Sequence, residues 1–263
     1  MHPVTVTRGD SPLVLGFPHT GTWVPDAIRA ELNAEGLTLR DTDWHVDALY
    51  RDLVPGVTAV AANFHRYVID ANRDPGGASL YPGQTTTGLV PMTTFDNAPI
   101  WNSPPDAAAI AARLARWHAP YHAALQAELA RVRALHGVAI LYDCHSIRSV
   151  IPWLFEGTLP DFNIGDNDGA TCDPLVTAAV RRHCDASART TVTNGRFKGG
   201  WTTRHYGRPE TGIHAIQMEL AQSTHLALEE PDFALDPAKA ERLRATLKPI
   251  LQDLIDLAPQ IPR

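Results

Sequence analysis

Val138-Ala-Ile-Leu-Tyr-Asp-Cys-His-Ser146 is the stretch of sequence that decides the fold. Residues 138–142 are apolar and rich in β-forming side chains, and Gly137 ends the helical pattern before them. A strand here delivers Asp143, Cys144, His145 and Ser146 to its carboxyl end, where open α/β sheets place their sites. We therefore expect an α/β protein with a functional site near His145.

The rest of the chain alternates strand and helix patterns around this strand. Apolar runs and β-type residues predict further strands over 11–17, 57–62, 67–70, 190–193 and 214–220. Helical spacing predicts helices over 43–53, 105–135, 174–184 and 237–257, the second one kinked or divided by Pro120. This alternation predicts a mixed, largely parallel central sheet with helices on both faces, in a single domain over residues 1–263.

Composition narrows the class of partner. The chain has 263 residues and a formal net charge of -6. This charge gives no electrostatic reason to expect nucleic acid or an anionic membrane as a partner, because those partners usually require a clustered basic surface. Neither a signal-peptide pattern nor a run of about eighteen apolar residues is present. Three cysteines, an odd number, make a disulfide framework improbable. We expect a cytoplasmic protein that acts on a small molecule.

Three residues are candidate metal ligands. A hydrolytic zinc site needs about three His, Asp or Glu ligands and an open position for water. His19, after the strand over 11–17, Asp43 and His145 could supply them, with Asp47, one helical turn beyond Asp43, as an alternative. Spacing leaves other readings open, because His19 could cap a turn and Asp43 could cap a helix.

Candidates for proton transfer follow from the same reasoning. Glu219, near the end of the strand over 214–220, is the first candidate for a general base, and Glu156 is the second. A covalent mechanism is disfavoured, because Ser146 and Cys144 are neighbours of His145 on a strand and point to its opposite face. No Gly-x-Ser-x-Gly elbow and no phosphate-binding loop occurs in the sequence.

Several cations are suited to a substrate with carboxylates. Arg66 and Arg73 fall at strand ends, and the glycine-broken segment 194–207 carries Arg196, Lys198, Arg204 and His205. The long segment 76–105, rich in Gly, Pro and Thr, is typical of a lid or binding loop. An ordinary solvated surface would also explain about half of such arginines.

The sequence resembles the N-formylglutamate amidohydrolase family from about residue 10 to 226. The resemblance rests on motifs in the same order: Ser11-Pro12, Pro18-His-Thr-Gly21, Asp41-Thr-Asp-Trp-His45, Arg66-Tyr-Val-Ile-Asp-Ala-Asn-Arg73, Tyr81-Pro-Gly-Gln-Thr-Thr-Thr-Gly88, Asp143-Cys-His-Ser-Ile-Arg-Ser-Val-Ile-Pro152, Asn194-Gly-Arg-Phe-Lys-Gly-Gly200 and Thr203-Arg-His-Tyr-Gly-Arg-Pro209. It implies hydrolysis of N-formyl-L-glutamate to formate and L-glutamate in histidine breakdown.

This family is similar to zinc carboxypeptidases and aspartoacylases, which implies a phosphorylase/peptidyl-hydrolase-like fold of the zinc-exopeptidase type. Their plan has a His and a nearby Glu ligand, a later His, and a Glu base. His19, His145 and Glu219 match it. The departure is the second ligand, because Thr22 stands where a Glu would, so Asp43 is the substitute, with Asp47 behind it.

The resemblance also implies roles for the cations. Arg66 polarises the scissile carbonyl, and Asn72 with Arg73 binds one substrate carboxylate. We assign the second carboxylate to Arg204, with His205 or Lys198. One zinc ion is expected, although His and carboxylate ligands accept other divalent metals. Alternatives are a hydrolase of another N-acyl amino acid and a non-catalytic dicarboxylate-binding protein; the oligomeric state is not predicted.

Overall fold

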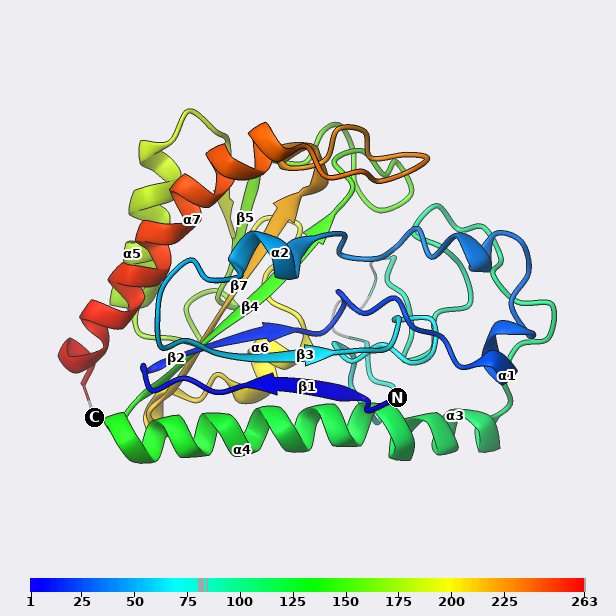
Figure 1. Ribbon diagram of the computed structural model, residues 1–263, viewed down its shortest axis with the longest axis horizontal. Helices are drawn as coiled ribbons and strands as arrows, with labels where there is room; N and C mark the ends of the chain where they lie inside the picture. The colour runs from blue at the N-terminus through cyan, green and yellow to red at the C-terminus, as the bar shows by residue number, and fades with distance from the viewer. Residues whose placement is uncertain (80–82, 84, 263) are drawn as a thin grey trace.

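A mixed seven-stranded sheet forms the centre of the protein (Figure 1). The computed structural model describes residues 1–79, 83 and 85–262. The sheet order is β1-β3-β2-β4-β7-β5-β6. Strands β2, β3, β4 and β7 run parallel, β1 and β5 are antiparallel to their neighbours β3 and β7, and β6 is parallel to β5. The strands are β1 Val4–Thr7, β2 Leu13–Phe17, β3 Thr58–Ala62, β4 Ala139–Ile147, β5 Phe162–Gly165, β6 Thr191–Thr193 and β7 Ile213–Ala221.

Helices cover both faces of this sheet (Figure 1). One apolar layer joins α4 to one face, and a second joins α2, α5 and α7 to the other. The α-helices are α1 Asp26–Arg29, α2 Val46–Tyr50, α3 Ala107–Arg113, α4 Ala119–His136, α5 Pro174–Ala186, α6 Trp201–Tyr206 and α7 Pro237–Leu257. The predicted fold class, a mixed, largely parallel sheet between helical layers, is confirmed. Its closer likeness to zinc exopeptidases stays a prediction.

Strand β4 is the buried centre of the sheet. All nine of its residues are buried, because it lies between β2 and β7 and is covered on both faces. Leu141 packs in the layer of α4, whereas Tyr142 packs in the opposite layer. This explains the continuous apolar run, which is typical of central parallel strands. The strand extends to Ile147, so that His145 lies within the sheet.

The predicted strand over 67–70 is wrong. Tyr67, Val68 and Ile69 are fully buried, but they lie in a turn and an irregular segment. The backbone N–H of Val68 donates to the carbonyl of His65, and that of Asp70 donates to the carbonyl of Leu89. A run of apolar residues indicates that the segment is buried, but a buried segment need not be a strand.

The helical stretch after 105 is divided as Pro120 predicts. Helix α3 continues into a π-helical segment, Leu114–His118, and α4 then begins with Pro120 in its first turn. Proline has no N–H to donate to the preceding turn, so the wider turn lies before it. Gly137 ends α4 with φ 80°, as expected for a glycine C-cap. No helix within the described ranges has both the length and the apolar character to cross a membrane.

Candidate functional site

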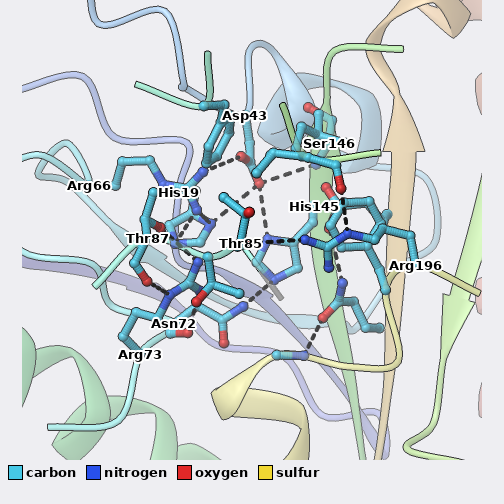
Figure 2. A pocket seen from close by; sticks show the side chains of 18 residues that line it. His19, Asp43, Arg66, Asn72, Arg73, Thr85, Thr87, His145, Ser146 and Arg196 are labelled. Atoms are coloured by element: carbon cyan, nitrogen blue, oxygen red, sulfur yellow. Dashed lines mark hydrogen bonds and ion pairs between the residues drawn. The ribbon is translucent and has the colours of Figure 1, made fainter. Parts of the chain in front are cut away.

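A pocket lies at the carboxyl ends of the parallel strands (Figure 2). It is lined by the three predicted metal ligands, by the predicted base Glu219, and by Arg66, Asn72 and Arg73. The loop residues Thr85, Thr86 and Thr87 form part of its wall. The predicted binding loop 76–105 therefore reaches the site, although residues 80–82 and 84 lie outside the described part of the chain.

His19, Asp43 and His145 form a buried cluster. The Nδ1 atom of His145 lies 3.0 Å from Asp43 Oδ2, and that of His19 lies 3.7 Å from the same oxygen. Ligand atoms of the three residues all lie within 4.8 Å of one another, and all three side chains are buried. Within the described residues this is the one group of three or more His, Cys, Asp or Glu side chains placed to hold a metal ion.

Two buried aspartates orient the two histidines. His19 Nε2 lies 2.7 Å from Asp70 Oδ1, and His145 Nε2 lies 3.2 Å from Asp143 Oδ1. Both rings therefore turn Nδ1 toward Asp43 and Nε2 toward a carboxylate. This arrangement fits a divalent metal, because a carboxylate behind a ligating histidine fixes its tautomer and orientation.

The backbone places Asp43 beside these histidines. The N–H of Asp43 donates to the carbonyl of His19 at 3.1 Å, and the N–H of Ser146 donates to Asp43 Oδ2 at 3.2 Å. Asp47 instead lies on α2, where its half-exposed side chain pairs with Arg51 at 2.8 Å. The choice between the two carboxylates therefore favours Asp43.

The charges of the cluster shift its pKa values. Burial alone would raise the pKa of Asp43, but hydrogen bonds from His145 and His19 outweigh it and hold that pKa below its usual value. Burial alone would lower the pKa of His145, but Asp143 and Asp43 raise it well above the usual value. The site is thus a strongly coupled group of charges, as is common at functional sites.

Glu219 lies beside His145 on the next strand. The two residues are in register between β4 and β7. Burial raises the pKa of Glu219 to about 8, because the negative Asp43 adds to the effect and His145 and Arg66 oppose it only in part. Its Oε2 accepts a hydrogen bond from Gln217 Nε2 at 3.0 Å. Glu156, the second candidate base, is exposed on a loop.

Three arginines line the pocket: Arg66, Arg73 and Arg196. Arg66 Nη2 lies 2.5 Å from His19 Nδ1, and its guanidinium lies over the ring of Phe95. Arg73 donates to the carbonyl and hydroxyl oxygens of Thr87, both at 2.9 Å. Arg196 donates to the carbonyl oxygens of Leu154 and Thr85, so it ties two loops to the pocket rim.

The remaining predicted substrate-binding residues lie outside the residues that line this pocket. Lys198 pairs with Asp168 at 2.9 Å, and Arg204 Nε donates to the carbonyl of Gly199. His205 stacks on Trp201 with 4.2 Å between ring centroids. Their role in binding stays a prediction.

Sequence reasoning missed three functional candidates, Asp70, Asp143 and Gln217, and it named Arg196 among the cations without assigning it to a substrate carboxylate. Asp143 and Gln217 had a usable signal, because each stands two residues before a candidate on the same strand and so shares its face. Asp70 had none, because only tertiary folding brings it to His19.

Comparisons with known proteins agree with this geometry. The family model described as N-formylglutamate amidohydrolase matches residues 11–226. The chain is 45% identical to an N-formylglutamate deformylase of Pseudomonas aeruginosa and 44% identical to one of Pseudomonas putida, in both cases over 94% of each chain.

Solved structures give the same answer. The crystal structure of an N-formylglutamate amidohydrolase from Ralstonia eutropha JMP134 superposes with a TM-score of 0.81 at 28% identity, covering 99% of this chain and 98% of that one. A gene product of Agrobacterium tumefaciens, at 18% identity and a TM-score of 0.75, covering 98% of this chain and 96% of that one, shares the fold. The resemblance seen in the sequence is confirmed, and the chain belongs to the N-formylglutamate amidohydrolase family.

Proposed function

We propose that this protein hydrolyses N-formyl-L-glutamate to formate and L-glutamate, with one zinc ion held by His19, Asp43 and His145. The observation that carries the proposal is the meeting of a buried His-Asp-His cluster, a buried glutamate and three arginines in one pocket. It is supported by relatives that are named for this reaction.

The metal would be held by the side chains of His19, Asp43 and His145. When bound, zinc lowers the pKa of a water molecule and polarises a carbonyl oxygen. The protein's contribution is orientation, since Asp70 and Asp143 each lie behind one histidine. Other divalent metals can use the same ligands, so zinc is the part of the proposal that metal analysis must test.

Glu219 is the proposed general base. Its carboxylate takes the proton from the attacking water and then gives it to the departing amine, so that one group serves both steps. A raised pKa suits this double role, because a group that titrates near neutral pH can both accept and release a proton. Its position in strand β7, beside His145, keeps it at a fixed distance from the cluster.

Arg66 is the proposed oxyanion donor. It lies beside His19 and 4.0 Å from Asp43 Oδ1, at the wall of the cluster. A fixed cation at this place stabilises the negative charge that develops on the formyl oxygen as the tetrahedral species forms. Hydrogen bonding to the carbonyl of Asp41 and packing on Phe95 hold the guanidinium there before substrate arrives.

The two substrate carboxylates require separate cations. We assign Asn72 and Arg73 to one of them, and we now assign the other to Arg196 in preference to Arg204, His205 and Lys198. Arg196 lines the pocket, whereas the other three do not. Arginine suits a carboxylate because its planar fork can donate two parallel hydrogen bonds.

The compartment and pathway belong to the same proposal. The three cysteines are buried and unpaired, which suits a reducing compartment such as the cytoplasm. Release of L-glutamate from its N-formyl derivative would place the protein in histidine breakdown.

A formate-release assay on N-formyl-L-glutamate tests the proposal. The purified protein is assayed as prepared, after chelation, and after addition of zinc; activity should disappear and then return. N-acetyl-L-glutamate and N-formyl-L-leucine are run beside it, and preference for either would assign a different N-acyl substrate. The Glu219→Gln variant should keep its zinc and lose about 10²- to 10⁴-fold in kcat. Near-normal turnover of that variant would reject Glu219 as the base, and binding of N-formyl-L-glutamate without any turnover would indicate a binding protein.

A further inference from the structure

A short backbone segment at the start of α6, Gly200–Thr202, connects the two sides of the pocket. On one side, the N–H of Thr202 donates to Asn72 Oδ1 at 2.8 Å. On the other side, the N–H of Gly200 donates to Gln217 Oε1 at 2.6 Å, and Gln217 Nε2 donates to Glu219 Oε2 at 3.0 Å. A continuous path of hydrogen bonds and backbone therefore joins Asn72 to Glu219.

We infer that Gly200–Thr202 and Gln217 are positioning residues, which hold the substrate-binding Asn72 and the base Glu219 in a fixed relation. This inference rests on the proposed function. It also gives the glycine-broken segment a role that its positive charges do not explain. The segment acts through backbone N–H groups, which are fixed in direction and cannot change rotamer.

The two backbone donors decide how two side-chain amides are turned. An amide has a carbonyl oxygen that accepts and an NH2 group that donates. Because Gly200 donates to the oxygen of Gln217, the NH2 group of Gln217 must face Glu219, where it can donate to the carboxylate. Because Thr202 donates to the oxygen of Asn72, the NH2 group of Asn72 faces the pocket and lies 3.2 Å from His145 Nε2. A flip of the Gln217 amide would set hydrogen against hydrogen at Gly200 and oxygen against oxygen at Glu219, and a flip of the Asn72 amide would set hydrogen against hydrogen at Thr202.

Glycine is required at position 200 by close approach. A Cβ built on Gly200 would lie 2.2 Å from Asn72 Nδ2 and 2.6 Å from Asn72 Oδ1. Asn72 is buried and is also held by its own N–H, which donates to Asp70 Oδ1 at 2.8 Å, so it has little room to move. The preceding Gly199 has φ +108°, a backbone conformation that other residues rarely adopt. The two glycines thus allow the segment to lie directly against Asn72.

The chain offers a control residue for mutations of Gln217. Gln252 on α7 also donates to a carboxylate, Asp256 Oδ1, at 2.9 Å, but it is exposed and is not among the residues that line the pocket. The change Gln217→Glu keeps an acceptor for Gly200 and replaces the donor with an oxygen that faces Glu219. The change Gln217→Met keeps the length of the side chain and removes both the acceptor for Gly200 and the donor to Glu219. Gln252→Glu is the control for the first of these changes.

The experiment measures kcat, KM, zinc content, thermal unfolding and the Kd of L-glutamate by calorimetry for each zinc-loaded protein. Gln217→Glu and Gln217→Met should lower kcat by about 10- to 100-fold, because small misplacements of a reacting group cost that much. Their Kd for L-glutamate should stay within about threefold of the wild type, on the scale of an undisturbed pocket. Gln252→Glu should match the wild type throughout.

Gly200→Ala should act on the other side of the pocket. The added Cβ displaces Asn72, so the Kd of L-glutamate and KM should both rise by about 10-fold or more. Gln252→Glu again serves as the control, because it leaves the residues that line the pocket unchanged.

The outcomes separate this inference from the proposed function. A wild-type protein that releases no formate would reject the function itself. An active wild type with unchanged kcat in both Gln217 variants, or unchanged Kd and KM in Gly200→Ala, would overturn the inference alone. Loss of activity only in proportion to the fraction of unfolded protein would also overturn it, since that is what a purely structural role predicts. Should Gly200→Ala fail to fold, the Gln217 variants decide the question.

Discussion

Two pairs of buried histidines lie near the pocket, and they differ in what their ring nitrogens contact. His19 and His145 meet aspartates on both sides of their rings. His118 and His122, one turn apart at the junction with α4, meet backbone carbonyls: His118 Nε2 lies 3.1 Å from the carbonyl of Arg73, and His122 Nε2 lies 2.8 Å from that of Ala71.

The difference in partner reverses the effect of burial. Burial lowers the pKa of His122 to about 3, because the neighbouring His118 adds to the effect and the hydrogen bond to the carbonyl of Ala71 opposes it only in part. The aspartates overcome the same effect at His145 and raise its pKa. A neutral histidine that donates to a carbonyl serves as a fixed support, and here the supports hold the backbone on either side of Asn72. A histidine between carboxylates is prepared to hold a cation.

The largest expected effect comes from breaking the carboxylate-bound pair. His145→Ala removes one of three proposed ligands, so bound zinc should be lost on dialysis, and formate release should fall by at least about 1,000-fold, the order that metal activation of water is worth. Metal analysis and the formate assay measure both. A variant that retains one zinc per chain would remove His145 from the ligand set.

A smaller effect is expected from changing Asp143, which contacts the proposed ligand His145. Thr203 Oγ1 donates to Asp143 Oδ2 at 2.8 Å. In Asp143→Asn the amide oxygen should keep this hydrogen bond, so the NH2 group takes the place of the carboxylate oxygen that faces His145 Nε2. Zinc affinity should fall by about 10- to 100-fold, as is usual for partners of metal-bound histidines. Competition with a chelating dye measures it.

Asp166→Asn is the control for this change, since Asp166 is also buried and also accepts from a threonine hydroxyl, that of Thr177, at 2.7 Å. Its zinc affinity should equal that of the wild type. Equal losses in the two variants would show that general destabilisation, and not orientation of His145, weakens the metal.

The carbonyl-bound pair should make the stability of the protein depend on pH. The unfolded chain protonates its histidines near pH 6.5, whereas folded His122 resists protonation down to about pH 3. The stability that depends on neutral His122 is therefore complete above pH 6.5 and is lost as pH falls toward 3. At pH 5 the loss amounts to about 2 kcal/mol for this residue.

His122→Gln keeps a donor for Ala71 and does not titrate. Urea unfolding at pH 7 and pH 5 should show a loss of stability smaller by about 2 kcal/mol than in the wild type, with zinc content unchanged. An unchanged pH dependence would contradict the assignment of His122 as a neutral support.

The smallest effect is expected for a pair of a histidine and a carboxylate that is partly open to solvent. His183 Nε2 lies 2.5 Å from Asp253 Oδ2, with about a quarter of each side chain exposed. His183→Gln should change stability by no more than about 1 kcal/mol and leave zinc unchanged, because solvent screens such pairs. A zinc loss here would mean that the proposed cluster is not the metal site.

The sequence predicted the parts of the site that local patterns carry. The apolar run before Asp143 identified the central strand, and strand ends marked His19 and His145. Asp70 could not be found in this way, since Tyr67, Val68 and Ile69 predict a strand that does not form. Arg196 was one of several cations in one glycine-broken segment, and no pattern distinguishes it from Lys198 or Arg204. The folded structure distinguishes them, because Arg196 lines the pocket, whereas Lys198 and Arg204 do not.

The long pairing of β4 with β7 has a consequence for how this family can diversify. His145 and Glu219 occupy matched positions on adjacent strands, so the sheet's own spacing, about 4.8 Å between strands, sets the distance between their backbones. Part of the pocket wall comes from loops, including Thr85–Thr87 and the segment with Arg196. If the proposed function holds, mutation can remodel substrate choice in the loops while His145 and Glu219 keep their geometry, and loops exchanged between relatives should change which acyl amino acid is accepted before they change the chemistry.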